Sequence, residues 1–348
     1  MRIGIIGGGQ LGQMLAISAF KMGHTVTVLD PNPNCSASTH ADVLVGEYKD
    51  EVKVSELCDI CDVVTYEFEN VPSSVVERDK IPQGFKPLAL SQNRNVEKQN
   101  ARNAGLLVNR TFKVTDKDSL IKASKELGFP FILKTASGGY DGKGQVIVHE
   151  IEEFDILSVE CIAEELIDFD YEISVIAVRG FDSSVVTLPV PRNVHVNNIL
   201  HMSIVPNEDE EINEIARSYA SRLLTESEIF GIVAIEFFVK GGDVYFNEMA
   251  PRPHNSGHYS IEGCDYSQFD LALKAILKEE LPKPKLLQPT IMVNILGQHM
   301  DKLNEVNEGF IHDYKKGEAR VNRKMAHVTF LNKSEEEVTK IFNKYWGK

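Results

Sequence analysis

Residues 232–248 are IVAIEFFVKGGDVYFNE, two apolar runs separated by a pair of glycines. Because paired glycines favour a tight turn between strands, this segment predicts a β-hairpin. Strict pairing puts Asn247 of the second strand opposite Glu236 of the first, whereas a bulge would bring Glu248 onto the same face. Two carboxylates and an amide oxygen suit Mg²⁺, and charges among so many apolar neighbours usually have a partner. The hairpin therefore predicts a metal site, and solvated acids at a sheet edge are the alternative.

The hairpin leads directly into the loop APRPHNSGHYS (250–260), which is dense in hydrogen-bond donors. A lone histidine is usually structural, but several convergent polar side chains beside a predicted metal site indicate a bound ligand. The polar side chains of this loop are Arg252, His254, Asn255, Ser256 and His258.

A second glycine-rich segment, SGGYDGKGQ (137–145), lies between two predicted strands. Glycines let the backbone approach phosphate oxygens closely, and Lys134 on the preceding strand could reach the same phosphates. The segment is not a Walker A loop, because it lacks the Gly-Lys-Ser/Thr ending and no helix follows it. It predicts a hairpin that covers nucleotide phosphates, although glycine-rich hairpins also occur without a ligand.

The chain begins MRIGIIGGGQLG, in which Gly7, Gly9 and Gly12 match the G-x-G-x-x-G pattern of dinucleotide-binding folds. Strands alternate with helices up to about residue 90, so this region predicts a parallel sheet. The strand in DVVTYEFEN runs into Glu67, and ligands of such sheets gather at the carboxyl ends of the strands. An NAD(P) oxidoreductase would explain residues 1–30 but leave the hairpins unused.

The 348 residues carry a formal net charge of −14, which disfavours nonspecific binding to nucleic acid or to an anionic membrane. No apolar run approaches the roughly 20 residues of a membrane span, and no signal segment precedes the first strand. We therefore expect a cytoplasmic protein with reduced cysteines. Cys58 and Cys61 form a C-x-x-C pair, but no second pair follows at zinc spacing, which favours two small apolar side chains.

Periodicity predicts further helices over 95–105, 117–127 and 208–228 and from Ser334 onward, with strands of a mostly antiparallel sheet between them. The proline-rich segment LPKPKLLQP (281–289) indicates a boundary. The predicted domains are a Rossmann-like domain, a nucleotide-binding domain and a small C-terminal domain, spanning residues 1–92, 93–280 and 281–348.

The C-terminal region contains a basic cluster within an otherwise acidic chain, formed by Lys315, Lys316, Arg320, Arg323 and Lys324. The cluster is either a solvated loop or a second phosphate site.

Together these motifs resemble those of the ATP-grasp enzymes. GGYDGKGQ and NEMAPRPHNSGH, with GGGQLG, YEFENV and ARVNRKMAHV, closely resemble the N5-carboxyaminoimidazole ribonucleotide synthetases of purine biosynthesis. The match runs in order through essentially the whole chain. It implies an ATP-grasp fold, of mixed α/β and α+β class, with a Rossmann-like pre-ATP-grasp domain and a small C-terminal domain. The implied reaction carboxylates 5-aminoimidazole ribonucleotide (AIR) with bicarbonate, through carboxyphosphate, and yields N5-carboxyaminoimidazole ribonucleotide, ADP and phosphate.

The resemblance also implies roles for individual residues, with ATP, Mg²⁺ or Mn²⁺, and bicarbonate as participants. Residues expected to contact ATP are Arg94, Lys134, Gly139, Tyr140, Asp141, Gly142, Lys143, Gly144, Gln145, Glu164, Glu165, Leu166, Ile167, Glu172, His195, Asn247 and Glu248. Glu236 and Glu248 would hold the metal. Residues expected at the ribonucleotide are Gln10, Leu11, Glu67, Arg252, His254, Asn255, Ser256, Lys316, Arg323 and Lys324.

Two positions depart from the usual family pattern. KKGEARVNRK carries an extra residue beside the tyrosine-x-lysine spacing, so either Lys315 or Lys316 could be the substrate lysine. Ala326 stands where the family usually shows glycine, a change from which little consequence is expected.

The implied chemistry assigns catalytic roles to Lys134, Lys316 and Asp141. Lys134 and the metal would neutralise the triphosphate while bicarbonate attacks the γ-phosphorus. Hairpin 138–144 would act as a lid, and Asp141 would handle a proton at the amine of AIR. The resemblance further implies a homodimer that passes its product to the N5-carboxyaminoimidazole ribonucleotide mutase.

Three other functions compete with this interpretation. A formate-dependent glycinamide ribonucleotide transformylase is the nearest alternative, but its nucleotide loop lacks the GGYDG lettering. A carboxylate–amine ligase acting on a peptide would not need the basic tail. A nonenzymatic binding module would not need the intact acid pair.

Overall fold

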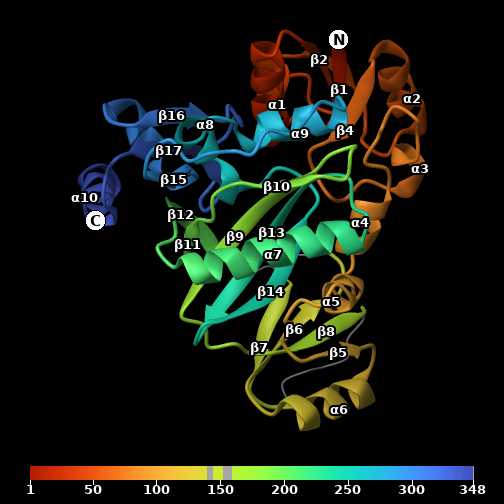
Figure 1. Ribbon diagram of the computed structural model, residues 1–348, viewed down its shortest axis with the longest axis vertical. Helices are drawn as coiled ribbons and strands as arrows, with labels where there is room; N and C mark the ends of the chain where they lie inside the picture. The colour runs from red at the N-terminus through yellow and green to blue at the C-terminus, as the bar shows by residue number, and fades with distance from the viewer. Residues whose placement is uncertain (139–143, 152–158, 348) are drawn as a thin grey trace.

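The computed structural model describes residues 1–138, 144–151 and 159–347, and within these ranges the strands form three sheets (Figure 1). The first sheet is parallel, with strand order β3-β2-β1-β4, as the alternation of strands and helices predicted. Its strands are β1 (Arg2–Ile6), β2 (Thr25–Asp30), β3 (Asp42–Val45) and β4 (Val63–Tyr66).

Helices cover both faces of the first sheet because its central strands are apolar on both sides. Ile3 and Ile5 of β1 pack in the same core as α1, whereas Ile6 packs with α2 on the other face. The helical elements of this region are α1 (Gln10–Lys21), η1 (Ser36–Thr39), α2 (Glu51–Ile60), α3 (Ser73–Val76) and α4 (Lys86–Ser91).

The second sheet is the largest of the three, with strand order β14-β13-β9-β11-β12-β15-β17-β16 and with β10 paired to β9. Its strands are β9 (Tyr171–Arg179), β10 (Val185–Thr187), β11 (Arg192–Val196), β12 (Ile199–Val205), β13 (Gly231–Lys240), β14 (Asp243–Ala250), β15 (Thr290–Leu296), β16 (Phe310–Asp313) and β17 (Lys324–Leu331). The sequence did not single out β11 and β16 as strands.

Alternation along β9 and β13 explains how this sheet is covered. Val175 and Val233 share a core with α7 (Glu210–Glu226), whereas Ile176 and Ile232 face α9 (Gln268–Ile276) and the first region. Figure 1 shows α7 crossing the sheet and α9 lying beside α1. The second sheet is thereby packed against the first region through α9.

The segment after residue 281 continues the second sheet, because β15 pairs with β12 and β17 pairs with β15. Its last helix is α10 (Glu335–Trp346), close to the helix that the sequence predicted from Ser334 onward, and Ser334 caps it. The domain boundary near 281 stays a prediction. The remaining short elements are η3 (Asn255–Gly257), α8 (Ser260–Gly263) and η4 (Gly297–Glu305).

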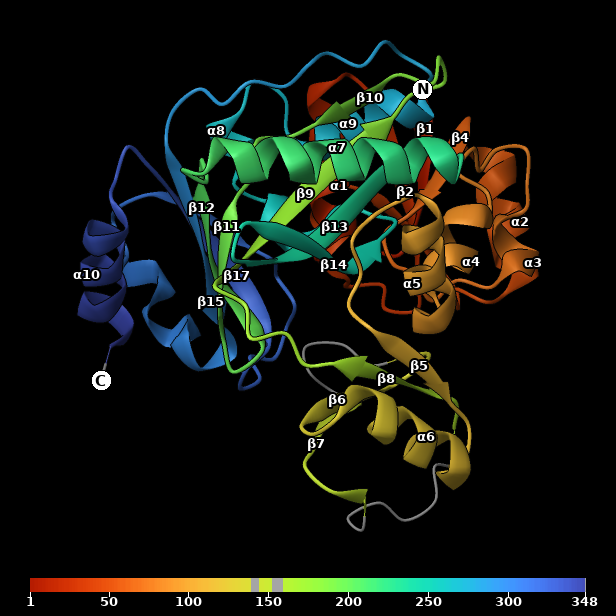
Figure 2. The same cartoon turned by 60° about the horizontal axis from the view of Figure 1, so that its bottom comes forward.

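The third sheet has the order β5-β8-β6-β7 and is covered by α6. In Figure 2 it lies at the bottom with α6, and α5 stands between it and α4. The elements of this unit are α5 (Arg94–Asn103), β5 (Thr111–Val114), α6 (Lys117–Leu127), β6 (Phe131–Thr135), β7 (Gln145–Val148) and β8 (Cys161–Glu165).

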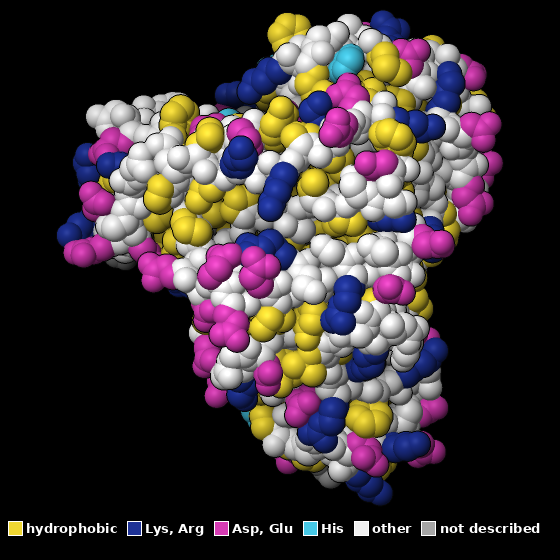
Figure 3. All heavy atoms as spheres, viewed as in Figure 1, with side chains coloured by type: hydrophobic (Ala, Val, Ile, Leu, Met, Phe, Trp, Pro, Cys, Tyr) yellow, Lys and Arg dark blue, Asp and Glu magenta, His cyan; other side chains and the backbone are white. Residues whose placement is uncertain are grey.

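The surface seen in Figure 3 intersperses acidic and basic side chains with apolar ones. Across the described ranges, no helix has both the length and the apolar character that crossing a bilayer requires. Cys58 and Cys61 are buried in the core that α2 shares with the first sheet.

Gly12 provides a test of how closely the first turn of α1 packs on β1. A Cβ added to Gly12 would lie 2.6 Å from the carbonyl oxygen of Gly7, and this backbone atom cannot rotate away. We expect Gly12→Ala to destabilise the protein by about 1–3 kcal/mol, measured as a lower midpoint of urea unfolding. Lys21→Ala, at the exposed end of the same helix, is the control and should leave the midpoint nearly unchanged. An unchanged midpoint for Gly12→Ala would contradict the close packing.

Candidate active site

The glycine-rich turn after β1 is filled by side chains of the protein itself. The Glu67 carboxylate accepts hydrogen bonds from the backbone N–H groups of Gly9, at 2.5 Å, and Gly12. The Asp30 carboxylate accepts from the Gly8 N–H at 2.9 Å and from the Tyr48 hydroxyl at 2.7 Å. The positions at which a dinucleotide fold holds its phosphates and ribose are thus occupied.

The hairpin of β13 and β14 contains the bulge that the sequence left open. Glu236 lies opposite Glu248, and the register shifts immediately after Glu236, so that Phe237 pairs with Phe246. Burial and the charge of Glu248 raise the pKa of Glu236 to about 7. Within the described residues, the buried Oδ1 of Asn247 has no hydrogen-bond partner. Two carboxylates and a spare amide oxygen are a donor set that fits a hard divalent cation.

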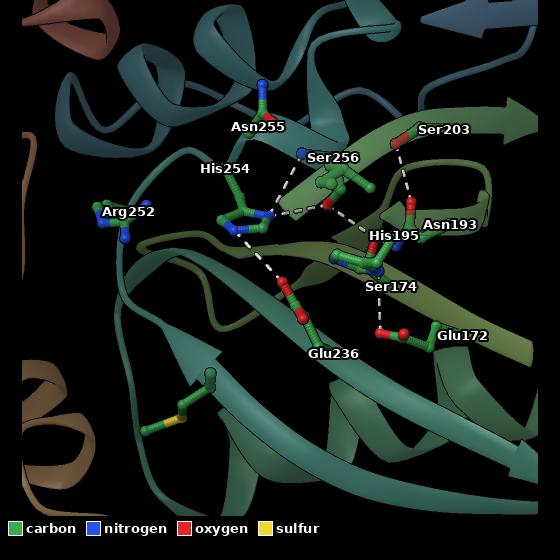
Figure 4. Close-up of polar contacts among 12 residues, drawn as sticks. Glu172, Ser174, Asn193, His195, Ser203, Glu236, Arg252, His254, Asn255 and Ser256 are labelled. Carbon is green, nitrogen blue, oxygen red and sulfur yellow. Dashed lines mark hydrogen bonds and ion pairs between the residues drawn. The ribbon is translucent and has the colours of Figure 1, made fainter. Parts of the chain in front are cut away.

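A carboxylate–imidazole cluster adjoins this hairpin (Figure 4). Nδ1 of His195 lies 3.1 Å from Oε2 of Glu172, and Nε2 of His254 lies 3.3 Å from Oε1 of Glu236. Ligand atoms of Glu172, His195 and Glu236 all lie within 4.8 Å of one another. Burial alone would lower the pKa of His195, but the close contact with the Glu172 carboxylate and the charge of Glu236 raise it.

Two lysines converge on Glu164 where β8 lies beside β6. Nζ of Lys134 and Nζ of Lys98 each lie 3.3 Å from Oε2 of Glu164. Burial opposes ionisation of Glu164, yet the two ammonium charges lower its pKa to about 2. Lys98 also donates to the carbonyl oxygen of Phe246 at 3.3 Å, which joins the third sheet to the hairpin.

Glu97 and Lys98 are functional candidates that the sequence reasoning missed. Glu97 is buried, accepts a hydrogen bond from the backbone N–H of Met249 at 2.6 Å, and has its pKa raised to about 8 by burial and by the charge of Glu248. A signal was present, because both residues lie at helical spacing from Ala101, on the face of α5 that is buried.

The loop 250–260 sends its side chains in several directions. Nη2 of Arg252 donates to Oε1 of Glu69 at 3.2 Å. Asn255 exchanges hydrogen bonds with Asn294, and the hydroxyls of Ser256 and Ser174 lie 2.8 Å apart. The predicted ligand contacts of Asn255 and Ser256 therefore stay predictions for two side chains that are buried and already hydrogen-bonded.

The N-terminal and C-terminal candidates lie together although they are far apart in the sequence. Nζ of Lys316 donates to Oε1 of Gln10 and, at 2.8 Å, to the carbonyl oxygen of Lys324. Lys315 points elsewhere and pairs with Asp313 at 2.6 Å. The structure thus brings Lys316, and not Lys315, to the start of α1.

The remaining predicted site residues do not gather at a single place in the structure. Leu11 is buried, Arg323 and Gln145 are exposed, and Glu165 pairs with Arg110 at 3.0 Å rather than facing Lys134. Nη1 of Arg94 donates to the carbonyl oxygen of Gly138 at 2.6 Å. The predictions for Gly139, Tyr140, Asp141, Gly142 and Lys143 fall outside the described residues.

Comparison with known protein families divides the chain into three matched segments. The description "ATP-grasp domain" matches residues 99–269, and "Ribonucleotide synthetase preATP-grasp domain" matches residues 1–85. Residues 290–341 match "Phosphoribosylaminoimidazole carboxylase C-terminal domain".

Individual relatives match over nearly their whole length. The N5-carboxyaminoimidazole ribonucleotide synthase of Staphylococcus saprophyticus is 41% identical, over 98% of this chain and 96% of that protein. The structure of N5-carboxyaminoimidazole synthetase from Staphylococcus aureus with ADP is 39% identical, with a TM-score of 0.92 over 99% of this chain and 96% of that one. The Aspergillus clavatus enzyme in complex with ADP and 5-aminoimidazole ribonucleotide is 29% identical, with a TM-score of 0.89 over 99% and 97% of the two chains.

The raised pKa of Glu97 predicts a pH-dependent stability of the ligand-free protein. The folded state binds a proton that an ordinary glutamate, with a pKa of 4.5, would have released, so stability is lost as pH rises through about 8. Glu97→Gln carries no charge and can still accept from Met249. We expect its melting temperature to match that of the unsubstituted protein near pH 5 and to exceed it near pH 9.

The control for this comparison is Glu126→Gln, on the exposed side of α6. Its melting temperature is expected to follow that of the unsubstituted protein at both pH values. A Glu97→Gln variant that is less stable at the higher pH would contradict the assignment of a buried, unfavourable charge.

Proposed function

The chain belongs to the N5-carboxyaminoimidazole ribonucleotide synthases, a family of ATP-grasp ligases, and we propose that it carboxylates AIR with bicarbonate at the expense of ATP. The observation that carries this proposal is a continuous series of contacts between the two predicted ligand sites. It runs from Glu236 through His254 and Gln268 to His258, and from there to Gln10 and Lys316.

The ATP end of this site is built from the third sheet and the hairpin. Lys134 is partly exposed beside Glu164, and its ammonium group is suited to a triphosphate oxygen. Lys98 is fully buried and holds Glu164, which keeps that carboxylate ionised and Lys134 oriented. Positioning of this kind is the main work of a protein in phosphoryl transfer, since the transition state needs alignment and charge stabilisation.

The predicted magnesium ion fits the same end. Glu236 and Glu248 would hold it, and Asn247 offers a further oxygen. The mutual repulsion that raises the pKa of Glu236 is the kind that a divalent cation relieves. When bound, the ion would supply charge neutralisation at the phosphates. Mn²⁺ shares the preference for these oxygen ligands.

The AIR end is the surface around Gln10, Lys316 and Lys324. An ammonium group beside the start of α1 suits the phosphate of a ribonucleotide. Arg252 follows the hairpin directly in the chain, is held by Glu69 and is suited to an anion formed from bicarbonate. In this proposal carboxyphosphate forms at the hairpin, and either carboxyphosphate or CO₂ released from it carboxylates the amine of AIR, with phosphate as the leaving group.

Asp141 and the lid that contains it belong to the proposal on the strength of the family resemblance alone. A homodimer, and transfer of the product to the N5-carboxyaminoimidazole ribonucleotide mutase, are proposed on the same resemblance.

The reaction is tested by ADP release from the purified protein with Mg²⁺. We expect release that requires AIR and bicarbonate together, because each substrate completes a different end of the site. Omitting either one should reduce the rate to the background of ATP hydrolysis. Equal release with formate and glycinamide ribonucleotide would overturn the proposal in favour of the transformylase.

The choice between the two adjacent lysines gives a matched pair of variants. Lys316→Met removes an ammonium group at Gln10, and we expect the KM for AIR to rise about 10- to 100-fold, as for loss of a charged hydrogen bond. Lys315→Met removes the partner of Asp313 and should change that KM by less than about twofold. The reverse order in steady-state kinetics would assign the substrate phosphate to Lys315.

A further inference from the structure

The side-chain amide of Gln268 has a fixed orientation. Its Oε1 accepts a hydrogen bond from the backbone N–H of His254 at 2.8 Å, and a backbone N–H can only donate. Its Nε2 must therefore be the NH₂ group, which donates to the carbonyl oxygen of His254 at 2.8 Å and to Nδ1 of His258 at 2.9 Å.

This orientation decides the tautomer of His258. Because Nδ1 accepts a hydrogen bond, it carries no proton, so the neutral ring carries its proton on Nε2. The ring is fully buried, with His327 at 4.9 Å and Phe269 at 5.7 Å between ring centroids. Burial also lowers the pKa of His258 well below its usual range, which agrees with a neutral ring.

The next residue in the series, Gln10, is held between two donors. The Lys316 ammonium group can only donate, so the atom of Gln10 that faces it is the carbonyl oxygen. The NH₂ group of Gln10 then faces the Nε2–H of His258 at 3.4 Å. Two donors that face each other form no hydrogen bond, so the contact between Gln10 and His258 is mismatched as long as Lys316 holds Gln10.

A rotation of the Gln10 amide removes this mismatch. If Lys316 moves away from Gln10, the carbonyl oxygen can turn toward His258 and accept from Nε2–H. Lys316 moves away when a stronger acceptor than an amide oxygen is offered to it, and the phosphate group of a ribonucleotide is one.

We propose that His258 is a positioning residue that acts through Gln10: its Nε2–H donates to the Gln10 carbonyl oxygen when the phosphate of a substrate binds Lys316, and so favours the release of that lysine from Gln10. The inference rests on the proposed function, since it assigns Lys316 to the substrate phosphate. It adds a second orientation of the Gln10 amide, in which the carbonyl oxygen faces His258. The buried side chains of His258 and Gln268 make this orientation favourable.

The tautomer is tested by ¹⁵N NMR of the full-length protein labelled at histidine. The His258 signals are identified by their loss in His258→Phe. We expect Nε2 to be protonated and Nδ1 to have the shift of an unprotonated nitrogen. On addition of ribose 5-phosphate, the Nε2 proton should move downfield, as a new hydrogen bond requires, and should stay in place in Gln10→Met. A proton on Nδ1 in the free protein, or no movement on saturation with the probe, would overturn the inference.

Kinetics give an independent test through a double-mutant cycle. His258→Phe keeps an aromatic ring and removes the donor, and we expect the KM for AIR to rise about fivefold to tenfold while the KM for ATP stays within about twofold. In a Gln10→Met background the same change should have no further effect. Phe269→Leu disturbs the packing of His258 without touching its nitrogens and is the control for a purely structural effect.

The outcomes separate the inference from the function on which it rests. Additive effects of the two substitutions, or an equal rise in KM for AIR with Phe269→Leu, would show that His258 acts through packing and overturn the inference. Absence of AIR-dependent ADP release from the unsubstituted protein would overturn the proposed function. The NMR response to ribose 5-phosphate would still decide whether the side-chain amide of Gln10 rotates.

Discussion

Lys98 is a buried ammonium group that contacts Glu164 of the third sheet and the carbonyl oxygen of Phe246 in the hairpin. Burial lowers the pKa of Lys98, and the negative charge of Glu164 opposes that effect. Removing one partner of a buried pair typically costs about 3–5 kcal/mol, since an uncompensated charge is left behind. The two contacts of Lys98 therefore help to align Lys134 with the hairpin acids, beside the backbone bridge between Val108 and Phe246.

A different constraint governs the first region, where a dinucleotide-type turn is filled by side chains of the protein. A Cβ at Gly7 or Gly9 would lie 2.4 or 2.6 Å from atoms of Glu67, so these glycines make room for a carboxylate of the protein. The N-terminus of α1 then binds that carboxylate as it would bind a phosphate. The glycine-rich pattern thus gives the fold of a dinucleotide-binding domain, but a carboxylate of the protein takes the place of the dinucleotide phosphates. Gln10, at the start of α1, contacts Lys316 instead.

The sequence predicted the elements whose pattern is local. The hairpin, its terminal acids and the long amphipathic helices follow from turn residues and periodicity, and the structure has them. The bulge could only be stated as an alternative, because one extra residue decides which side chain meets Glu236. Glu97 and Lys98 were missed because two charged residues in a polar helix are typical of a solvated face, and their burial depends on a sheet far away in the sequence. The choice of Lys316 over Lys315 likewise needed the tertiary structure, since a positive φ at Lys315 turns the chain between them.

The two predicted ligand sites are joined by a series of side-chain contacts in which Gln268 is the central member. Gln268 fixes the backbone of His254, whose ring meets Glu236, and fixes the ring of His258, which meets Gln10. One amide can fix the backbone at His254 and the ring of His258 at once, because its oxygen can only accept and its NH₂ group can only donate. His254 and His258 are four residues apart in one loop, so a shift of that loop would move both contacts together. This series of contacts joins the carboxylate hairpin to the lysine cluster, and Gln10 is the member that faces a donor on each side.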